Sequence, residues 1–126
     1  MTRLLLKADV LSVHVPLTRE NEKLIGPAEF AALKTGAILL NTSRGAVVDE
    51  DSLLAALING RLAGAALDVI QDEYASNSPV RNQIINYAAT HSNLLLTPHI
   101  GGATHDSLER VEIFMAEKLR RFLQSL

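Results

Sequence analysis

Four short apolar runs are spaced along the chain, and they constrain its fold more than any other feature of the 126 residues. The runs cover residues 10–15, 37–40, 63–69 and 93–97. None of them alternates strictly between apolar and polar side chains, which is typical of strands covered on both faces of a parallel sheet. The third run is rich in alanine, but its brevity and the nearby Gly60 and Gly64 favour a strand over a helix.

Helix signals lie between the first three runs. Pro27 suits the first position of a helix over residues 28–34, and Gly36 can end it. Asp49 is a good N-cap for a second helix over residues 50–59, because its carboxylate can accept from a backbone N–H of the first turn. The sequence therefore predicts one helix after the first strand and another after the second.

Three other segments complete the pattern. Residues 106–126 carry an apolar stripe at helical spacing and are predicted to form a helix. Residues 71–92 are the most polar stretch, and we expect a long loop there with at most one short helix. Residues 1–8 resemble the last turns of a helix that leads into the first strand. Strands that alternate with helices in this way predict an α/β domain of about four parallel strands joined by crossover helices.

Composition and length narrow the functional classes. The chain is long enough for one domain, and 48% hydrophobic residues can form a core. A net charge of −2, few aromatic residues and no run of 18 apolar residues give no sign of nucleic-acid or membrane binding. The absence of cysteine excludes disulfides, thiolate nucleophiles and Cys-ligated metals. No signal peptide is recognisable, and we expect a cytoplasmic protein.

Two polar residues follow strand-like runs in glycine-containing turns. Arg44 lies in NTSRGAVVDED and His99 lies in LLLTPHIGG. Ligands of open parallel sheets bind at the carboxyl ends of the strands, where both side chains are expected. A guanidinium can hold a carboxylate with its planar fork, and an imidazole can transfer a proton near neutral pH. Together they predict chemistry on a small carboxylic acid, although each alone has an ordinary structural explanation as a surface arginine or a loop histidine.

Two acidic residues complete the candidate set. Asp68 ends an apolar run, so it either forms a structural hydrogen bond or binds a ligand. Glu73 follows five residues later and would orient an imidazole if it lay beside one. The remaining histidines and Ser43 have no spacing suited to a metal site or to serine hydrolysis, so no metal is expected.

Four motifs in order resemble one enzyme family. They are VLSVHVPLT, LNTSRGAVVDEDSLLAAL, GRLAGAALDV and LLLTPHIGGAT. The chain is similar, from about Lys7 to Leu126, to the C-terminal part of the NAD-binding domain of the D-isomer-specific 2-hydroxyacid dehydrogenases, which include phosphoglycerate dehydrogenase. The resemblance implies a partial Rossmann-like three-layer domain over residues 1–126, without its Gly-rich first half and without the substrate domain. No two glycines stand two residues apart, so the phosphate-binding fingerprint is absent from this sequence.

The resemblance also implies roles for individual residues. Arg44 would hold the substrate carboxylate, His99 would transfer a proton to or from the substrate oxygen, and Glu73 would orient His99. Asp68 would bind the nicotinamide carboxamide of NAD, with NADP not excluded. Residues of the cofactor-binding site would be His14, Val15, Pro16, Thr42, Ser43, Asp68, His99, Gly101 and Gly102. The family usually has Pro after the catalytic Glu, whereas this chain has Tyr74.

Three functional interpretations stay open from the sequence. The first is a truncated NAD-dependent D-2-hydroxyacid dehydrogenase that is inactive on its own and whose full-length relatives act on a 2-hydroxy or 2-keto acid. The second is a non-catalytic half-Rossmann module for interaction or oligomerisation. The third is a small enzyme that binds NAD across a homodimer. A homodimer is expected through the apolar edge from Val10 to Val15 or the apolar surface beside it, because such an edge can pair with another chain.

Overall fold

The computed structural model describes residues 1–73 and 79–125, and for residues 79–82 it describes the backbone only. The helices are α1 (Thr2–Leu5), α2 (Pro27–Ala32), α3 (Glu50–Ile58), α4 (Pro79–Thr90) and α5 (His105–Leu123). The strands are β1 (Val10–Val13), β2 (Ala37–Asn41), β3 (Leu62–Leu67) and β4 (Leu94–Leu96), and a 3₁₀ helix, η1 (Gly45–Val47), follows β2. No helix in these described ranges is long and apolar enough to cross a membrane.

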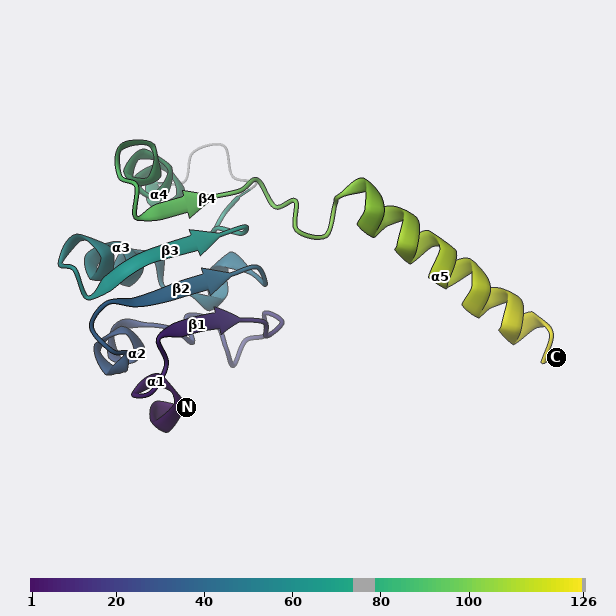
Figure 1. Cartoon of the computed structure of the whole chain (residues 1–126), viewed down its shortest axis with the longest axis horizontal. Helices are drawn as coiled ribbons and strands as arrows, with labels where there is room; N and C mark the ends of the chain where they lie inside the picture. Colours follow the sequence, from purple (N-terminus) through teal and green to yellow (C-terminus); the bar gives the residue numbers. More distant parts are fainter. Residues whose placement is uncertain (74–78, 126) are drawn as a thin grey trace.

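The strands form one parallel sheet in the order β1-β2-β3-β4 (Figure 1). The predicted α/β fold with four parallel strands is therefore confirmed. Alternate strand residues such as Leu11, Leu39 and Leu67 enter a core shared with Phe30 of α2 and Leu53 of α3. A parallel pair needs a crossover, and each helix between two strands provides one.

Only one face of the sheet is covered within the described residues. Val10, Ile38 and Leu95 point to the other face and are 53%, 40% and 63% exposed. The expectation that both faces are covered, as in a three-layer domain, is therefore wrong for the described residues: α2, α3 and α4 cover one face, and the other is exposed. The exposed apolar face is available for further packing.

The predicted cap of α3 is present. The Asp49 carboxylate accepts a hydrogen bond from the backbone N–H of Ser52 at 2.9 Å and forms an ion pair with Lys23 Nζ at 2.9 Å. Burial alone would raise the pKa of Asp49, but these partners together hold it below its ordinary value. The N-cap fixes where α3 begins, directly after the turn that carries Arg44.

The prediction of a long loop over residues 71–92, which allowed for one short helix, is wrong in its proportions, because α4 occupies twelve of these residues. Residues 74–78 of this range lie outside the described part of the chain. Pro79 begins the helix, where a missing N–H costs nothing. Ile84 is completely buried, and Tyr87 and Ala88 on the same side also pack against the core. This spacing of three and four residues is the helical signal that the polar composition of the segment obscures.

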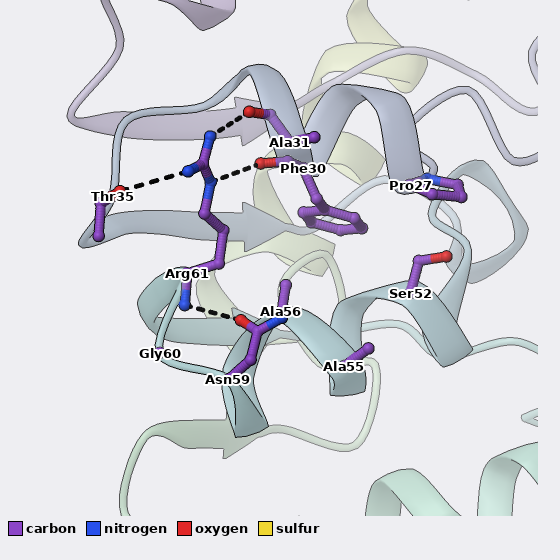
Figure 2. Close-up of a pocket in the computed structure, with 10 residues that line it drawn as sticks. All are labelled: Pro27, Phe30, Ala31, Thr35, Ser52, Ala55, Ala56, Asn59, Gly60 and Arg61. Carbon is purple, nitrogen blue, oxygen red and sulfur yellow. Dashed lines mark hydrogen bonds between the residues drawn. The ribbon is translucent and has the colours of Figure 1, made fainter.

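Arg61 ties α2 to the start of β3 (Figure 2). Its guanidinium donates to the carbonyl oxygens of Phe30 (3.2 Å), Ala31 and Leu33 (2.8 Å), and to Thr35 Oγ1 (3.3 Å). The last carbonyls of a helix have no partner within the helix, so a cation that binds them ends the helix favourably. Arg61 is therefore a structural cap at the amino ends of the strands.

The C-terminal helix α5 extends away from the sheet (Figure 1). The predicted helix over residues 106–126 is thus present as His105–Leu123, and Thr104 caps it by accepting from Ser107 N at 3.3 Å. None of its residues is buried, so its apolar stripe has no partner among the described residues.

Candidate active site

The carboxyl ends of β2, β3 and β4 lie side by side at one edge of the sheet. Arg44 follows β2, Glu73 follows β3 and His99 follows β4. Because these strands are parallel, their loops emerge at the same edge, where ligands bind in open α/β sheets. The fold thus places the three predicted catalytic residues on neighbouring loops.

The loops after β2 and β3 touch through Gly45. A Cβ atom at this position would lie 2.0 Å from the backbone carbon of Ile70, so only glycine permits the contact. Gly45 directly follows Arg44, and Ile70 lies three residues before Glu73. The contact therefore brings the backbone of the Arg44 turn against the loop that leads to Glu73.

Glu73 contacts His99 directly. Its Oε1 atom lies 2.8 Å from Nδ1 of the imidazole. His99 has a φ of 54°, and Asp72, just before Glu73, has a φ of 53°. Residues other than glycine rarely adopt this left-handed conformation, and it commonly marks functional sites. In the part of the chain that the structure describes, Nε2 of His99 has no hydrogen-bond partner and can face a substrate.

Asp68 fixes the loop that carries His99. Its carboxylate accepts from the hydroxyl of Thr97 and from the backbone N–H groups of Ile100 (3.0 Å) and Gly101 (2.8 Å). Burial alone would raise the pKa of Asp68, but these hydrogen bonds and the nearby His99 hold it below its ordinary value. The structural explanation left open for Asp68 is therefore realised, and its role in binding nicotinamide stays a prediction.

Asn41 shapes the turn that carries Arg44, and the sequence reasoning missed it. Its buried Oδ1 accepts from Ser43 N (3.0 Å) and Ser43 Oγ (2.9 Å), while its Nδ2 donates to the Arg44 carbonyl at 3.0 Å. The Arg44 side chain is exposed and donates from Nη1 to the Ser43 carbonyl at 2.6 Å. The guanidinium therefore lies on the surface, at the sheet edge formed by the carboxyl ends of the strands, where a carboxylate can reach it.

A cavity of about 420 Å³ lies beside His99 and Asp68. Its lining combines apolar and polar side chains from α4, from β4 and from the loops that follow β3 and β4: Asp68, Ile70, Glu73, Ile85, Leu96, Thr97, Pro98 and His99. A smaller hollow of about 180 Å³ adjoins it on the exposed face of the sheet. Ser12, His14, Thr42, Asp68 and Thr97 are among its lining residues.

The other predicted cofactor residues lie near this edge without forming a defined site. His14 is exposed and its Nε2 lies 2.7 Å from Ser12 Oγ. Val15 and Pro16 are exposed in the segment after β1. Gly102 is exposed, and a Cβ atom there would have no neighbour within 4 Å. Their predicted contacts with NAD remain untested by the geometry.

A larger hollow of about 570 Å³ lies elsewhere, between α2 and α3 (Figure 2). Its charged lining residue is Arg61, whose guanidinium is already bound to the carbonyls of α2. This hollow is at the opposite end of the strands from His99. Within residues 1–73 and 79–125, no group of three His, Asp or Glu side chains is arranged to hold a metal ion.

Comparison with known proteins decides the family. The model of the D-isomer specific 2-hydroxyacid dehydrogenase NAD-binding domain matches residues 1–101. The chain belongs to this family. The resemblance in the four sequence motifs is thereby confirmed, and with it the assignment to an NAD-binding domain of an oxidoreductase family.

Curated members of the D-2-hydroxyacid dehydrogenase family match almost the whole chain. It is 40% identical to a putative D-3-phosphoglycerate dehydrogenase of Schizosaccharomyces pombe over 128 residues, which cover 98% of this chain and 28% of the relative. It is 44% identical to glyoxylate reductase of Thermococcus litoralis over 119 residues, covering 94% of this chain and 34% of that enzyme. The chain thus spans about a third or less of the length of these relatives.

Solved structures of dehydrogenases share the fold. D-lactate dehydrogenase from Aquifex aeolicus, solved with NAD and lactic acid, superposes with a TM-score of 0.83 at 33% identity, over 98% of this chain and 40% of that one. D-2-hydroxyisocaproate dehydrogenase gives a TM-score of 0.85 at 28% identity, over 98% and 39%. The partial Rossmann-like fold predicted from sequence is confirmed.

The residues at the strand edge fit the nicotinamide end of NAD. The 420 Å³ cavity has apolar walls that suit a flat ring, and polar atoms of Asp68 and Thr97 lie in its lining. For the diphosphate the fit is poor, since this sequence has no Gly-x-Gly pair to approach it closely. The cavity at the carboxyl ends of the strands is therefore consistent with the NAD-binding domain that the family model describes.

Proposed function

We propose that this chain forms the nicotinamide-binding and proton-transfer part of a D-2-hydroxyacid dehydrogenase site, acting on a small 2-hydroxy or 2-keto acid. The single observation that supports this most is the 2.8 Å contact between Glu73 and His99 beside a cavity at the strand edge. A carboxylate at Nδ1 keeps a proton on that nitrogen and directs Nε2 outward. The bound nicotinamide cofactor would supply the hydride as NADH in reduction and accept it as NAD⁺ in oxidation.

The residues of the chain divide the remaining work. In reduction, His99 donates the proton at Nε2 to the substrate carbonyl oxygen, and in oxidation it takes the proton back from the hydroxyl. Arg44 binds the substrate carboxylate through its planar guanidinium. Glu73 orients the imidazole through its contact with Nδ1. Asp68 holds the Thr97–Gly101 backbone, so that His99 keeps its direction.

The 126-residue chain tested alone is expected to be inactive. Without a Gly-rich loop to hold the diphosphate, we expect its Kd for NADH to be weaker than about 1 mM. NADH fluorescence titration measures the Kd, and absorbance at the NADH band measures oxidation of D-lactate, D-glycerate or 3-phosphoglycerate. Turnover that disappears in His99→Ala would favour a small enzyme that binds NAD across two copies. If NADH does not bind at any concentration that the titration can reach, the result would favour the non-catalytic module.

We also propose that the chain pairs with a second copy through the edge from Val10 to Val15. β1 is an edge strand, and Val10 and Val15 are both exposed. Unpaired N–H and C=O groups on such an edge can bind a second strand, and antiparallel pairing about a two-fold axis closes the assembly. Light scattering should give at least twice the 13.7 kDa of one chain, whereas a monodisperse monomer would refute the pairing.

We place the protein in the cytoplasm from its sequence alone.

A further inference from the structure

Glu50 is a buried carboxyl group that the proposed chemistry does not use. It occupies the first position of α3 and is 2% exposed. Its Oε1 atom accepts a hydrogen bond from the backbone N–H of Gln71 at 2.5 Å, across 21 residues of sequence. Its Oε2 atom is also buried and has no hydrogen-bond partner among the described residues. A buried polar group of this kind is costly, so its position calls for a reason.

The partner of Glu50 leads directly to the site. Gln71 is followed by Asp72, whose left-handed backbone turns the chain, and then by Glu73, whose carboxylate reaches His99. The contact of Gly45 with Ile70 holds the Arg44 turn against this same loop, one residue before Gln71. Two independent contacts therefore anchor the short segment from which Glu73 projects.

We propose that Glu50 is a positioning residue, which holds the Gln71 backbone so that the Glu73 carboxylate faces Nδ1 of His99. The inference deepens the proposed function, because it concerns how the proton-transfer pair is aligned. It assigns no direct contact between Glu50 and a substrate or cofactor. Glu50 is connected to His99 through the backbone of Gln71 and the carboxylate of Glu73.

The charge of Glu50 is sensitive to pH. Burial raises its pKa to about 7, and the carboxylates of Asp49, Asp51 and Asp72 add to the shift, while Lys23 neutralises Asp49. The protonated acid and the carboxylate both present an acceptor at Oε1. The Gln71 contact should therefore exist on both sides of the titration, with a stronger hydrogen bond to the carboxylate.

Two substitutions at position 50 separate the acceptor from the side-chain volume. Glu50→Met has a similar size and helix propensity but cannot accept the hydrogen bond from Gln71. Glu50→Gln keeps an amide oxygen at the place of Oε1. Asp51→Asn is the matched control, because it removes a neighbouring exposed carboxylate on the same turn without touching the loop.

The experiment is NMR of the full 126-residue chain at about pH 8.5, where imidazole is neutral. Hydrogen exchange reports the Gln71 amide, and the ring ¹⁵N shifts report which nitrogen of His99 carries the proton. We expect the Gln71 amide to exchange at least about tenfold faster in Glu50→Met, and the Nδ1–H form of His99 to give way to a mixture of tautomers. Glu50→Gln and Asp51→Asn should stay close to wild type in both readouts.

An unchanged His99 tautomer in Glu50→Met, or equal disruption in Glu50→Gln and Glu50→Met, would overturn the proposal. If Glu50→Met does not fold, the wild-type chain gives the test: the Gln71 amide proton should shift with the same midpoint as the Glu50 carboxyl carbon, and an independent midpoint or no shift would overturn it. None of these readouts needs NADH. Failure to bind NADH would therefore count against the proposed function alone.

Discussion

Oε1 of Glu73 lies 2.8 Å from Nδ1 of His99, although 26 residues separate them in the sequence. Two left-handed backbone positions, at Asp72 and at His99 itself, turn the loops after β3 and β4 toward each other. The pair is therefore assembled by loop geometry at the strand edge. The stability of these loops should decide whether the site is formed, and the first three predictions concern them.

Gly45→Ala should destabilise the chain by about 2–3 kcal/mol or more, because the new methyl group would overlap the backbone at Ile70 and push the two loops apart. Urea unfolding measures the change. Gly102→Ala is the control, since a Cβ atom there meets nothing within 4 Å, and its effect should stay within about 0.5 kcal/mol. Equal stability of the two variants would contradict the close approach at Gly45.

Thr97→Val should loosen the loop that carries His99, because the hydroxyl that binds Asp68 is lost. We expect a cost of about 1–3 kcal/mol at neutral pH, typical for a hydrogen bond to a charged group. Thr97→Ser, which retains the hydroxyl, should lie much closer to wild type.

The pH dependence of this difference follows from the sign of the Asp68 shift. Its pKa is lowered in the fold, so the stability it contributes is present above its ordinary pKa and is lost as the pH falls through the folded value. The gap between wild type and Thr97→Val should therefore shrink in acid. Urea unfolding at several pH values measures it, and a gap that widens in acid would refute this role of the hydroxyl.

The raised pKa of Glu50 should make the free energy of unfolding fall as the pH rises, opposite to the effect of Asp68 in acid. The pKa of Glu50 is raised from 4.5 to about 7, so its contribution is fully present below pH 4.5 and is lost as the pH rises through about 7. The lost stability is on the order of 3 kcal/mol by linkage. Glu50→Gln, which cannot ionise, should flatten this part of the stability curve. Parallel curves for wild type and Glu50→Gln between pH 4 and 8 would show that Glu50 titrates normally.

Arg61→Met should cost about 2–3 kcal/mol, because it leaves the last carbonyls of α2 without a donor. Arg61→Lys keeps the charge but not the fork, and an intermediate loss is expected. The ¹⁵N signals of His99 should not change in either folded variant, since Arg61 lies at the amino ends of the strands. A loss below about 0.5 kcal/mol in Arg61→Met would contradict the capping role.

Much of the fold could be predicted because local patterns encode it. Apolar runs predicted each strand within a few residues, and Asp49 predicted where α3 begins. The length of α4 was not predicted, because the segment is mostly polar and its helical signal depends on Ile84 and the residues one turn later. The apolar stripe of α5 was predicted, but its exposure was not, since periodicity shows which face is apolar and not what covers it.

Some residues of the candidate site could be predicted from the sequence and others could not. Arg44 and His99 stand in motifs that predict a ligand edge, so sequence alone could single them out. Asn41 acts within its own turn, through Ser43 and Arg44, but an asparagine there does not by itself indicate a site residue. Glu50 and Thr97 act through partners on another loop, and nothing local marks them as site residues. Their functions depend on which loops the sheet order brings together.

The most direct test of the account is an NMR titration of the chain with reduced nicotinamide mononucleotide, with AMP as the ligand that lacks nicotinamide. The account predicts amide shifts at Asp68, at Thr97 and from His99 to Gly101, with a Kd weaker than about 1 mM, and loss of the shifts at His99 in the Asp68→Ala variant. AMP should leave these amides unchanged. Shifts confined to the hollow around Arg61, or identical shifts with both ligands, would contradict a nicotinamide site at this strand edge.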